Sequence, residues 1–279
     1  FIWRSFMQQI MSQIRAAVDS YQLIQSGDRI AVGISGGKDS LVLLCALANM
    51  RKFLPMKYDL VAITVDPCFD NIQTDFRQVE ELCRRLQIKY EIRRSQLGNI
   101  IFEQRKESNP CSLCARMRRG ILHDMSKKHN CNKLALGHHF DDVIETTLIG
   151  MFYASQLKAM IPKLHSTNFE GMELIRPMYC IHEEDIISWM NYNGLEFIQC
   201  ACRFTENYTL NNNEGGISKR QEIKMLIRQL KKDNPLIDKS IFNSIHSVSL
   251  DTMPGYKTHG KTYSFLDNYY NNERSEEQL

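Results

Sequence analysis

Ile34-Ser35-Gly36-Gly37-Lys38-Asp39-Ser40-Leu41 is the stretch that decides the fold of this 279-residue chain. The apolar run Ile30–Ile34 leads into it and the apolar run Leu41–Leu47 follows it, which predicts a strand, a tight turn and a helix. Adjacent glycines allow unusual backbone conformations and let a ligand approach closely. Amide groups at the start of a helix favour an anion. The turn Ser35–Ser40 is therefore expected to hold a polyphosphate.

The spacing of the glycines excludes two other phosphate-binding loops. A Walker loop needs Gly-x-x-x-x-Gly-Lys, whereas only two residues separate Gly33 from Gly36. The Gly-x-Gly-x-x-Gly pattern of dinucleotide-binding folds is also absent. The string Ser-Gly-Gly-Lys-Asp-Ser instead resembles the pyrophosphatase loop of the ATP pyrophosphatase superfamily. Members of that superfamily cleave ATP between the α and β phosphates and adenylate a carbonyl oxygen. A glycine-rich turn without catalytic meaning is the alternative.

The composition limits the class of protein. With 43% hydrophobic and 24% charged residues, the chain suits one large or two small domains with a sizeable core. A net charge of +3 permits a nucleic-acid partner without requiring one. No apolar run approaches the roughly 20 residues that span a bilayer, and no secretory leader is visible. We expect a cytoplasmic protein with no membrane partner.

Strands and helices alternate along the chain. Helical spacing of apolar residues from Met7 to Tyr21 predicts an amphipathic N-terminal helix. Further strands are expected at residues 58–65, 88–92, 133–136 and 195–198, with helices at 76–86 and 182–192. This order predicts an α/β fold with a doubly wound, mostly parallel sheet. A mixed connection with a short hairpin is expected over 150–177.

Two further groups follow predicted parallel strands. Because ligands of such sheets lie beyond the carboxyl ends of the strands, Val65 and Asp66 are placed where adenine and ribose would rest. A turn or capping role for Asp66 is the alternative. Gly137 and His138 lead into paired carboxylates, Asp141 and Asp142, at a helix start. An imidazole there could touch phosphate and the carboxylates could hold Mg²⁺, although a capping aspartate with solvated histidines is the other interpretation.

The nine cysteines are an odd number, which does not suit a disulfide framework. Cys111 and Cys114 form a Cys-x-x-Cys pair, and Arg116 belongs to a run of arginines that follows it. The pair could share a metal such as zinc, form a redox disulfide or be a buried structural pair. A nearby arginine could lower thiol pKa values and contact phosphate. Cys200 and Cys202 follow the predicted strand at 195–198.

The three motifs together resemble the tRNA 2-thiocytidine synthetase family over roughly residues 10 to 250. They are Ser35–Ser40, the Cys111/Cys114 pair and Gly137–Glu145, in this order. The resemblance implies an adenine nucleotide α-hydrolase-like fold and a 4Fe-4S cluster held by three cysteines. The family usually has a late Cys-x-x-Cys where this chain has Cys200-Ala201-Cys202. Cys200 is the expected third ligand and Cys202 the alternative.

The resemblance also implies a mechanism. Adenylation would make a pyrimidine C2 oxygen a leaving group, and sulfur would then replace it, with 2-thiocytidine in the anticodon loop as the expected product. Lys38, Asp39 and Asp142 are the expected catalytic residues, and Asp39 and Asp142 would hold Mg²⁺. The expected ATP-binding residues are Ser35, Gly36, Gly37, Lys38, Asp39, Ser40, Val65, Asp66, Arg116, Gly137 and His138. The implied partners are tRNA, a sulfur donor (sulfide or a cysteine desulfurase) and a second copy of the chain.

Four segments are expected. They are an N-terminal helical segment (1–25), the ATP pyrophosphatase domain with the cluster cysteines (26–202), a C-terminal helical segment (203–250) and a tail or flap (251–279). Helices are expected at 219–231 and 235–246. The cations of the first, from Lys219 to Lys232, are a candidate tRNA-binding surface, and a solvated charged face is the alternative.

Other activities remain open at this point. They are a persulfide-based thiouridylase, a lysine-transferring or amidating ligase, and a nucleotide-binding iron–sulfur protein without turnover. The cysteine pair disfavours the ligase, and the acidic pair Asp141/Asp142 weakly disfavours the non-catalytic protein.

Overall fold

The computed structural model describes residues 3–101, 110–194, 218–267 and 269 of the chain. It contains two compact units, Phe1–Leu226 and Ile227–Leu279. The predicted strand at 195–198, Cys200 and Cys202 lie outside the described residues.

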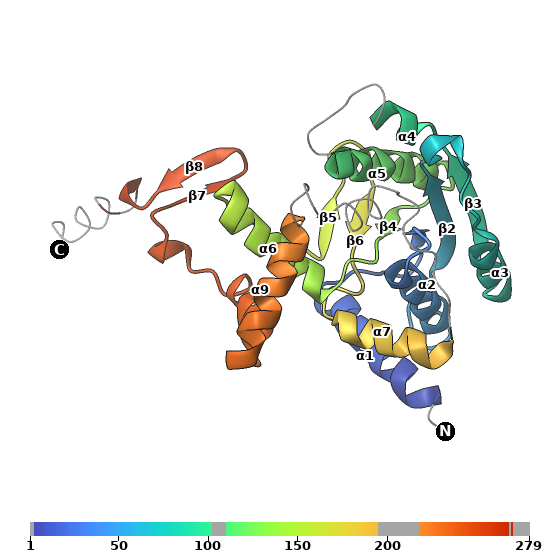
Figure 1. The fold of residues 1–279 in the computed structure, drawn as a ribbon, viewed down its shortest axis with the longest axis horizontal. Coiled ribbons are helices and arrows are strands. Elements are labelled where there is room, and N and C mark those ends of the chain that lie inside the picture. Colours follow the sequence, from blue (N-terminus) through green and yellow to red (C-terminus); the bar gives the residue numbers. More distant parts are fainter. Residues whose placement is uncertain (1–2, 102–109, 195–217, 268, 270–279) are drawn as a thin grey trace, which may run out of the picture. The chain divides into compact units, whose positions relative to one another are not determined.

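A six-stranded sheet forms the centre of the first unit (Figure 1). Its order is β3-β2-β1-β4-β6-β5, and every neighbouring pair is parallel except β5 and β6. The strands are β1 (Arg29–Gly33), β2 (Asp59–Asp66), β3 (Lys89–Arg94), β4 (Lys133–Ala135), β5 (Lys163–His165) and β6 (Glu173–Ile175). The prediction of a doubly wound, mostly parallel sheet is confirmed. The predicted hairpin at 150–177 is also confirmed, and β6 joins the parallel sheet directly.

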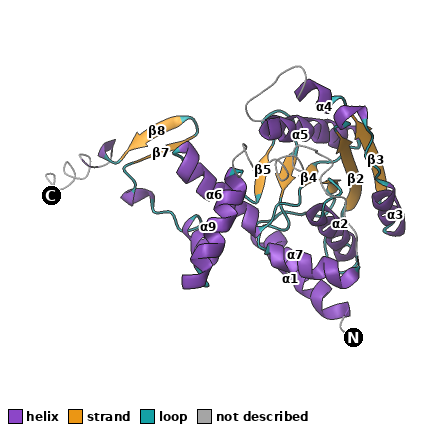
Figure 2. Cartoon of the chain, viewed as in Figure 1, coloured by secondary structure: helices purple, strands orange, loops and turns teal. Residues whose placement is uncertain are grey.

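Helices cover both faces of this sheet, as Figure 2 shows. One layer has α1 (Trp3–Ser20), α2 (Lys38–Met50), α3 (Arg77–Arg85) and α7 (Glu183–Asn193), and the other has α4 (Leu97–Asn99) and α5 (Pro110–Lys128). Ile10, Ile14 and Val18 are almost fully buried at four-residue spacing, so the predicted amphipathic helix packs on the core. The sheet and its helices thus form a three-layer α/β sandwich.

The carboxyl ends of the parallel strands meet at one edge of the sheet. β1 leads through the glycine-rich turn into α2, and β4 leads through residues 136–139 into α6 (Phe140–Ala154). β1 and β4 are direct neighbours, with Val32 opposite Ala135. The two predicted loops therefore lie beside each other.

The second unit contains the end of α9 (Lys219–Asp233), the helix α10 (Ile237–Ser244) and an antiparallel hairpin. The hairpin consists of β7 (Gly255–Thr258) and β8 (Lys261–Ser264), with His259 and Gly260 at positive φ in the turn. Such a two-residue turn matches the twist of paired strands. Among the described helices, none is long and apolar enough to cross a membrane.

Candidate active site

The glycine-rich turn is closed by its own hydroxyl groups. The Ser40 hydroxyl donates to the Gly37 carbonyl oxygen (2.9 Å), and the Ser35 amide donates to Ser40 Oγ (3.2 Å). Gly36 has a φ of 85°, a conformation that favours glycine. The first amides of α2, from Lys38 to Ser40, have no acceptor within the helix. They can therefore bind an anion placed over the turn.

Lys38 is held between two carboxylates at this turn. Its Nζ lies 3.2 Å from Asp39 Oδ1 and 3.0 Å from Glu183 Oε1. Burial lowers the pKa of Lys38, but Asp39 and Glu183 raise it by more, so the net shift is upward. The side chain therefore carries a positive charge where phosphate would bind.

Gly137 brings the β4 loop against the phosphate turn. A Cβ built on Gly137 would lie 3.0 Å from the carbonyl carbon of Asp39 and 3.1 Å from both Asp39 O and Ser40 N. These are backbone atoms, which have little freedom to move. The close approach is possible because the residue has no side chain.

A Gly137→Ala variant is therefore expected to lose ATP affinity by about tenfold or more, because the new methyl group must displace the phosphate turn. Isothermal titration with a non-hydrolysable ATP analogue measures this change. Gly120→Ala is the matched control, since a Cβ there meets nothing within 4 Å. Unchanged affinity in Gly137→Ala would show that the turn tolerates the displacement.

His139 connects the carboxylates of the two loops. Its Nε2 lies 3.9 Å from Asp39 Oδ1 and 3.5 Å from Asp142 Oδ2, and its Nδ1 lies 3.5 Å from Asp141 Oδ2. Burial lowers the pKa of His139, but the three carboxylates outweigh it and raise the pKa above its usual value. The structure thus brings Asp39 and Asp142 to one imidazole nitrogen.

The donor atoms at this point are suited to a cation. Asp39 Oδ1 is buried and receives no hydrogen bond from the described residues. Asp142 Oδ2 accepts a hydrogen bond from the His139 amide (3.2 Å), which also caps α6. Carboxylate oxygens are typical ligands of Mg²⁺.

Arg220 and Lys224 of α9 reach the same carboxylates. Arg220 Nη1 lies 2.6 Å from Asp142 Oδ1 and 3.0 Å from Glu145 Oε2. Lys224 Nζ lies 2.6 Å from Glu183 Oε2, and Glu183 also pairs with Lys38. The sequence interpretation missed Glu183 as part of this site and assigned the two cations to a tRNA-binding surface. Glu183 lies in the first turn of α7, where a carboxylate also favours the helix start, so its position alone does not mark a site residue.

Asp66 and Val65 lie at the end of β2, as predicted, and both are buried. The carboxylate of Asp66 accepts hydrogen bonds from the Cys68 amide (3.1 Å), the Thr74 amide (3.0 Å) and the Thr74 hydroxyl (3.2 Å). These bonds shape the connection that follows β2. A cavity of about 790 Å³ lies beside this connection, lined by Cys68, Arg93, Arg94 and neighbouring residues.

The cysteine pair lies in the first turns of α5. Cys111 and Cys114 are three residues apart on this helix, and Cys114 is partly buried. Residues at this spacing lie on one face of a helix. Arg116 is exposed on the same helix. Within the described ranges, no three His, Cys, Asp or Glu side chains are placed so that they could together hold a metal ion.

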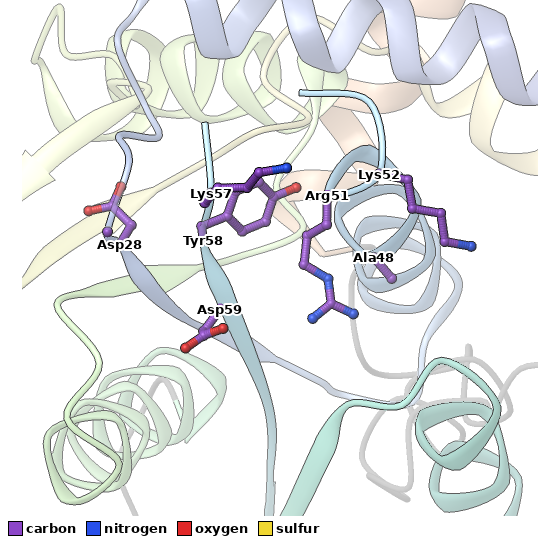
Figure 3. A pocket seen from close by; sticks show the side chains of 8 residues that line it. Asp28, Ala48, Arg51, Lys52, Lys57, Tyr58 and Asp59 are labelled. Carbon is purple, nitrogen blue, oxygen red and sulfur yellow. The ribbon is translucent and has the colours of Figure 1, made fainter. Parts of the chain in front are cut away.

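A second cavity, of about 600 Å³, lies at the opposite end of the sheet (Figure 3). Asp28 and Asp59 line it near the amino ends of β1 and β2, together with Arg51 and Lys52 from the end of α2. The phosphate turn is at the carboxyl ends of the strands. This cavity therefore does not belong to the candidate active site.

A glycine-rich turn with a lysine, next to a second loop of carboxylates, defines an ATP-binding protein of the PP-loop class. The family model of the PP-loop domain matches residues 6–212. A relative from Geotalea uraniireducens (strain Rf4) is 37% identical over 241 residues, which cover 86% of this chain and 91% of the relative. A relative from Syntrophotalea carbinolica is 40% identical and covers 83% of this chain and 86% of the relative. Both are named tRNA-cytidine(32) 2-sulfurtransferase.

The chain thus belongs to the tRNA-cytidine(32) 2-sulfurtransferase family of PP-loop proteins. Among solved structures, the U34-tRNA thiolase NcsA from Methanococcus maripaludis, solved with its [4Fe-4S] cluster, is similar in fold. The TM-score is 0.69 at 23% identity, and the match covers 88% of this chain and 78% of that one. The resemblance inferred from the sequence is confirmed.

Proposed function

We propose that this protein uses ATP to replace the C2 oxygen of cytidine 32 in tRNA by sulfur. The observation that carries the proposal is the direct contact of the Gly137 loop with the phosphate turn, in a chain that belongs to this family. This arrangement gathers the charged groups that an adenylation reaction needs. The activity named for the relatives supplies the substrate.

In the first step, the base oxygen attacks the α phosphorus of ATP. A phosphorus–oxygen bond forms, the bond between the α phosphorus and the bridging oxygen breaks, and pyrophosphate leaves. The amides of residues 35–40 and the Lys38 ammonium would bind the β and γ phosphates. A positive charge placed where negative charge develops lowers the barrier. His138 would lie beside the phosphates from the β4 loop.

Mg²⁺ bound by Asp39 and Asp142 would neutralise the departing pyrophosphate. Asp39 Oδ1 supports this assignment, because it is buried and receives no hydrogen bond from the described residues, although Lys38 Nζ lies 3.2 Å away. Arg220 now holds Asp142 Oδ1, so the metal would share this carboxylate or take it over from the arginine.

In the second step, sulfur forms a bond to C2, the bond between C2 and oxygen breaks, and AMP leaves. Cys111, Cys114 and Cys200, with Cys202 as the alternative, would hold a 4Fe-4S cluster that supplies the site of sulfur delivery. Two cysteines three residues apart in one helix fit such a ligand set. The [4Fe-4S] cluster with which the thiolase NcsA was solved supports this assignment.

The proposed partners are tRNA, a sulfur donor (sulfide or a cysteine desulfurase) and a second copy of the chain, in the cytoplasm. Arg228 and Lys232 of α9 remain candidate phosphate contacts for tRNA. Exposed apolar side chains at the end of α6, Met151 and Phe152, support the second copy.

The test is anaerobic incubation of the purified protein with ATP, sulfide and tRNA that lacks the modification, followed by mass spectrometry of nucleosides. We expect 2-thiocytidine from the native protein and none from Cys114→Ser. Cys114→Ser should also lose the broad visible absorbance of the cluster, because a thiolate ligand is removed. Its affinity for ATP should stay within about twofold of native, since the cysteine lies outside the phosphate turn.

Cys68→Ser is the control, since Cys68 is also a partly buried cysteine but follows β2 and is not part of α5. It should keep both the absorbance and the activity. A native protein that makes no thiolated nucleoside would contradict the proposed function. A full cluster in Cys114→Ser would contradict only the ligand assignment.

A further inference from the structure

Arg176 is a buried cation at the edge of the sheet where the active site lies. It directly follows β6 and is only 6% exposed. Its Nη1 donates a hydrogen bond to the Ile161 carbonyl oxygen, and its Nε has no hydrogen-bond partner among the described residues. A guanidinium group has five N–H donors and carries a full charge. Among the described residues, the Arg176 side chain donates to this one neutral acceptor, so most of its five N–H donors are not used there.

The described charged residues near Arg176 do not neutralise its positive charge. Burial, followed by the charge of Arg119 on α5, lowers the pKa of Arg176 to about 10. Asp142 and Tyr179 act in the opposite direction. Asp142 is engaged elsewhere, since Arg220 holds its Oδ1 and the His139 amide donates to its Oδ2. Across the described ranges, Arg176 forms no ion pair with a carboxylate.

His138 belongs to the loop after β4, which leaves the sheet at the same edge as Arg176. Burial, followed by the charge of Arg176, lowers the pKa of His138 to about 4, so its imidazole is neutral near pH 7. Its Nδ1 is buried and, within the described residues, has no hydrogen-bond partner. In the part of the chain that the structure describes, Arg176 has no counter-ion, and a buried cation in that state is destabilising. Two polar groups at one sheet edge, each with a buried nitrogen that has no hydrogen-bond partner among the described residues, point to an anion that arrives from outside the chain.

The topology places this anion next to the phosphates of ATP. Ile175 of β6 is opposite Ala135 of β4, so Arg176 and the Gly137 loop leave the sheet at the same edge. β6 is the second strand from β1, which is about 10 Å away at the usual strand spacing. The phosphate turn follows β1 and would hold the β and γ phosphates. Arg176 therefore lies beyond them, on the side of β4 and α5.

We propose that Arg176, with His138 beside it, binds the phosphate of the base adenylate and of the AMP that is later released. This inference rests on the proposed function, because it assigns a residue to the reacting phosphate. The fork of N–H groups on arginine matches two oxygens of one phosphate. When the bond between C2 and oxygen breaks, the electron pair stays on the AMP oxygen. The guanidinium stabilises the charge that develops there.

The test compares the binding of three probes, AMP, pyrophosphate and adenosine, to the native protein and to Arg176→Gln by isothermal titration. We expect Arg176→Gln to lose AMP affinity by about tenfold or more, because a charge-assisted pair is removed. Its affinities for pyrophosphate and adenosine should stay within about twofold of native, since neither carries the α phosphate. Affinity for pyrophosphate that falls as far as that for AMP would overturn the assignment to this phosphate.

Thermal unfolding without ligand separates binding from a structural role. Removing an uncompensated buried cation should leave the melting temperature of Arg176→Gln equal to or above that of the native protein. A lower melting temperature with unchanged AMP affinity would assign Arg176 to the fold alone and overturn the proposal. Arg176→Lys keeps the charge without the fork and should retain part of the AMP affinity. If Arg176→Gln does not fold, the AMP affinity of Arg176→Lys is the measurement that tests the proposal.

Arg29→Gln is the matched control. Arg29 begins β1 at the opposite end of the sheet, and its Nε also lacks a hydrogen-bond partner among the described residues. Its substitution should leave AMP affinity unchanged. A native protein that binds AMP through Arg176 but makes no thiolated nucleoside would contradict the proposed function alone. A native protein that thiolates tRNA, with normal AMP binding in Arg176→Gln, would contradict this inference alone.

Discussion

A Lys38→Met variant is expected to release pyrophosphate, in the presence of tRNA, about 100- to 1,000-fold more slowly than the native protein, the usual effect of removing a group that stabilises developing charge. Lys38 provides the ammonium at the phosphate turn, 3.0 Å from Glu183 and 3.2 Å from Asp39. The variant should still fold. Glu183 keeps a cation without Lys38, because Lys224 lies 2.6 Å from its other oxygen. Single-turnover measurement of pyrophosphate checks the rate.

Lys163→Met is the control for this variant. Lys163 resembles Lys38 in exposure (25% against 21% of the side chain), and its Nζ lies 3.2 Å from Glu173. It also donates to the Gln22 carbonyl oxygen and belongs to the edge strand β5, three strands away from β1 and the phosphate turn. Its rate should stay close to native. If Lys38→Met keeps more than about a tenth of the native rate, Lys38 does not act on the leaving phosphate.

A Lys133→Met variant is expected to lose about 3–5 kcal/mol of unfolding free energy, because two carboxylates would lose a shared buried cation. Lys133 is 2% exposed at the start of β4. Its Nζ lies 2.9 Å from Asp28 Oδ2 and 3.2 Å from Glu173 Oε2, and it donates to the Leu23 carbonyl oxygen at 2.8 Å. These bonds join β4 to β6 and to the chain before β1. Urea unfolding measures the loss.

Lys89→Met provides the comparison, since Lys89 is the first residue of β3 and is exposed. Its change in unfolding free energy should stay within about 0.5 kcal/mol, as for most surface substitutions. Equal stabilities of the two variants would contradict the structural role of Lys133. The native ion pairs would then contribute no more than exposed ones.

The central part of the fold could be predicted from the sequence because its signals are local. The buried strands β1 and β2 are continuous apolar runs, and the helix α7 ends at Gly194, which has a φ of 57°. The shared edge of the Ser35–Ser40 turn and the Gly137 loop followed from the rule that parallel strands point the same way. The strands and the end of α7 are marked by neighbouring residues, and the shared edge of the two loops follows from the direction of the strands.

Interactions between distant segments could not be predicted in this way. A lysine at the start of a strand gives no sign that it is buried, as Lys133 is, between carboxylates far away in the sequence. Arg176 lies in a mixed segment between Pro162 and Pro177, where no periodicity marks β6. Arg220 was predicted to lie on a charged surface that could contact tRNA. Its partner Asp142 lies about 80 residues earlier in the chain, so the local helical pattern gives no sign of the contact. These contacts depend on how the elements pack.

The helix α5 carries the Cys111/Cys114 turn at its beginning and Arg119 further along. With a rise of about 1.5 Å per residue, the backbone positions of Cys114 and Arg119 are about 7.5 Å apart along the axis. The backbone hydrogen bonds of α5 fix this separation, so it does not depend on the conformation of the neighbouring loops. The helix therefore keeps Cys114, a proposed cluster ligand, at a constant distance from Arg119, whose charge acts on Arg176.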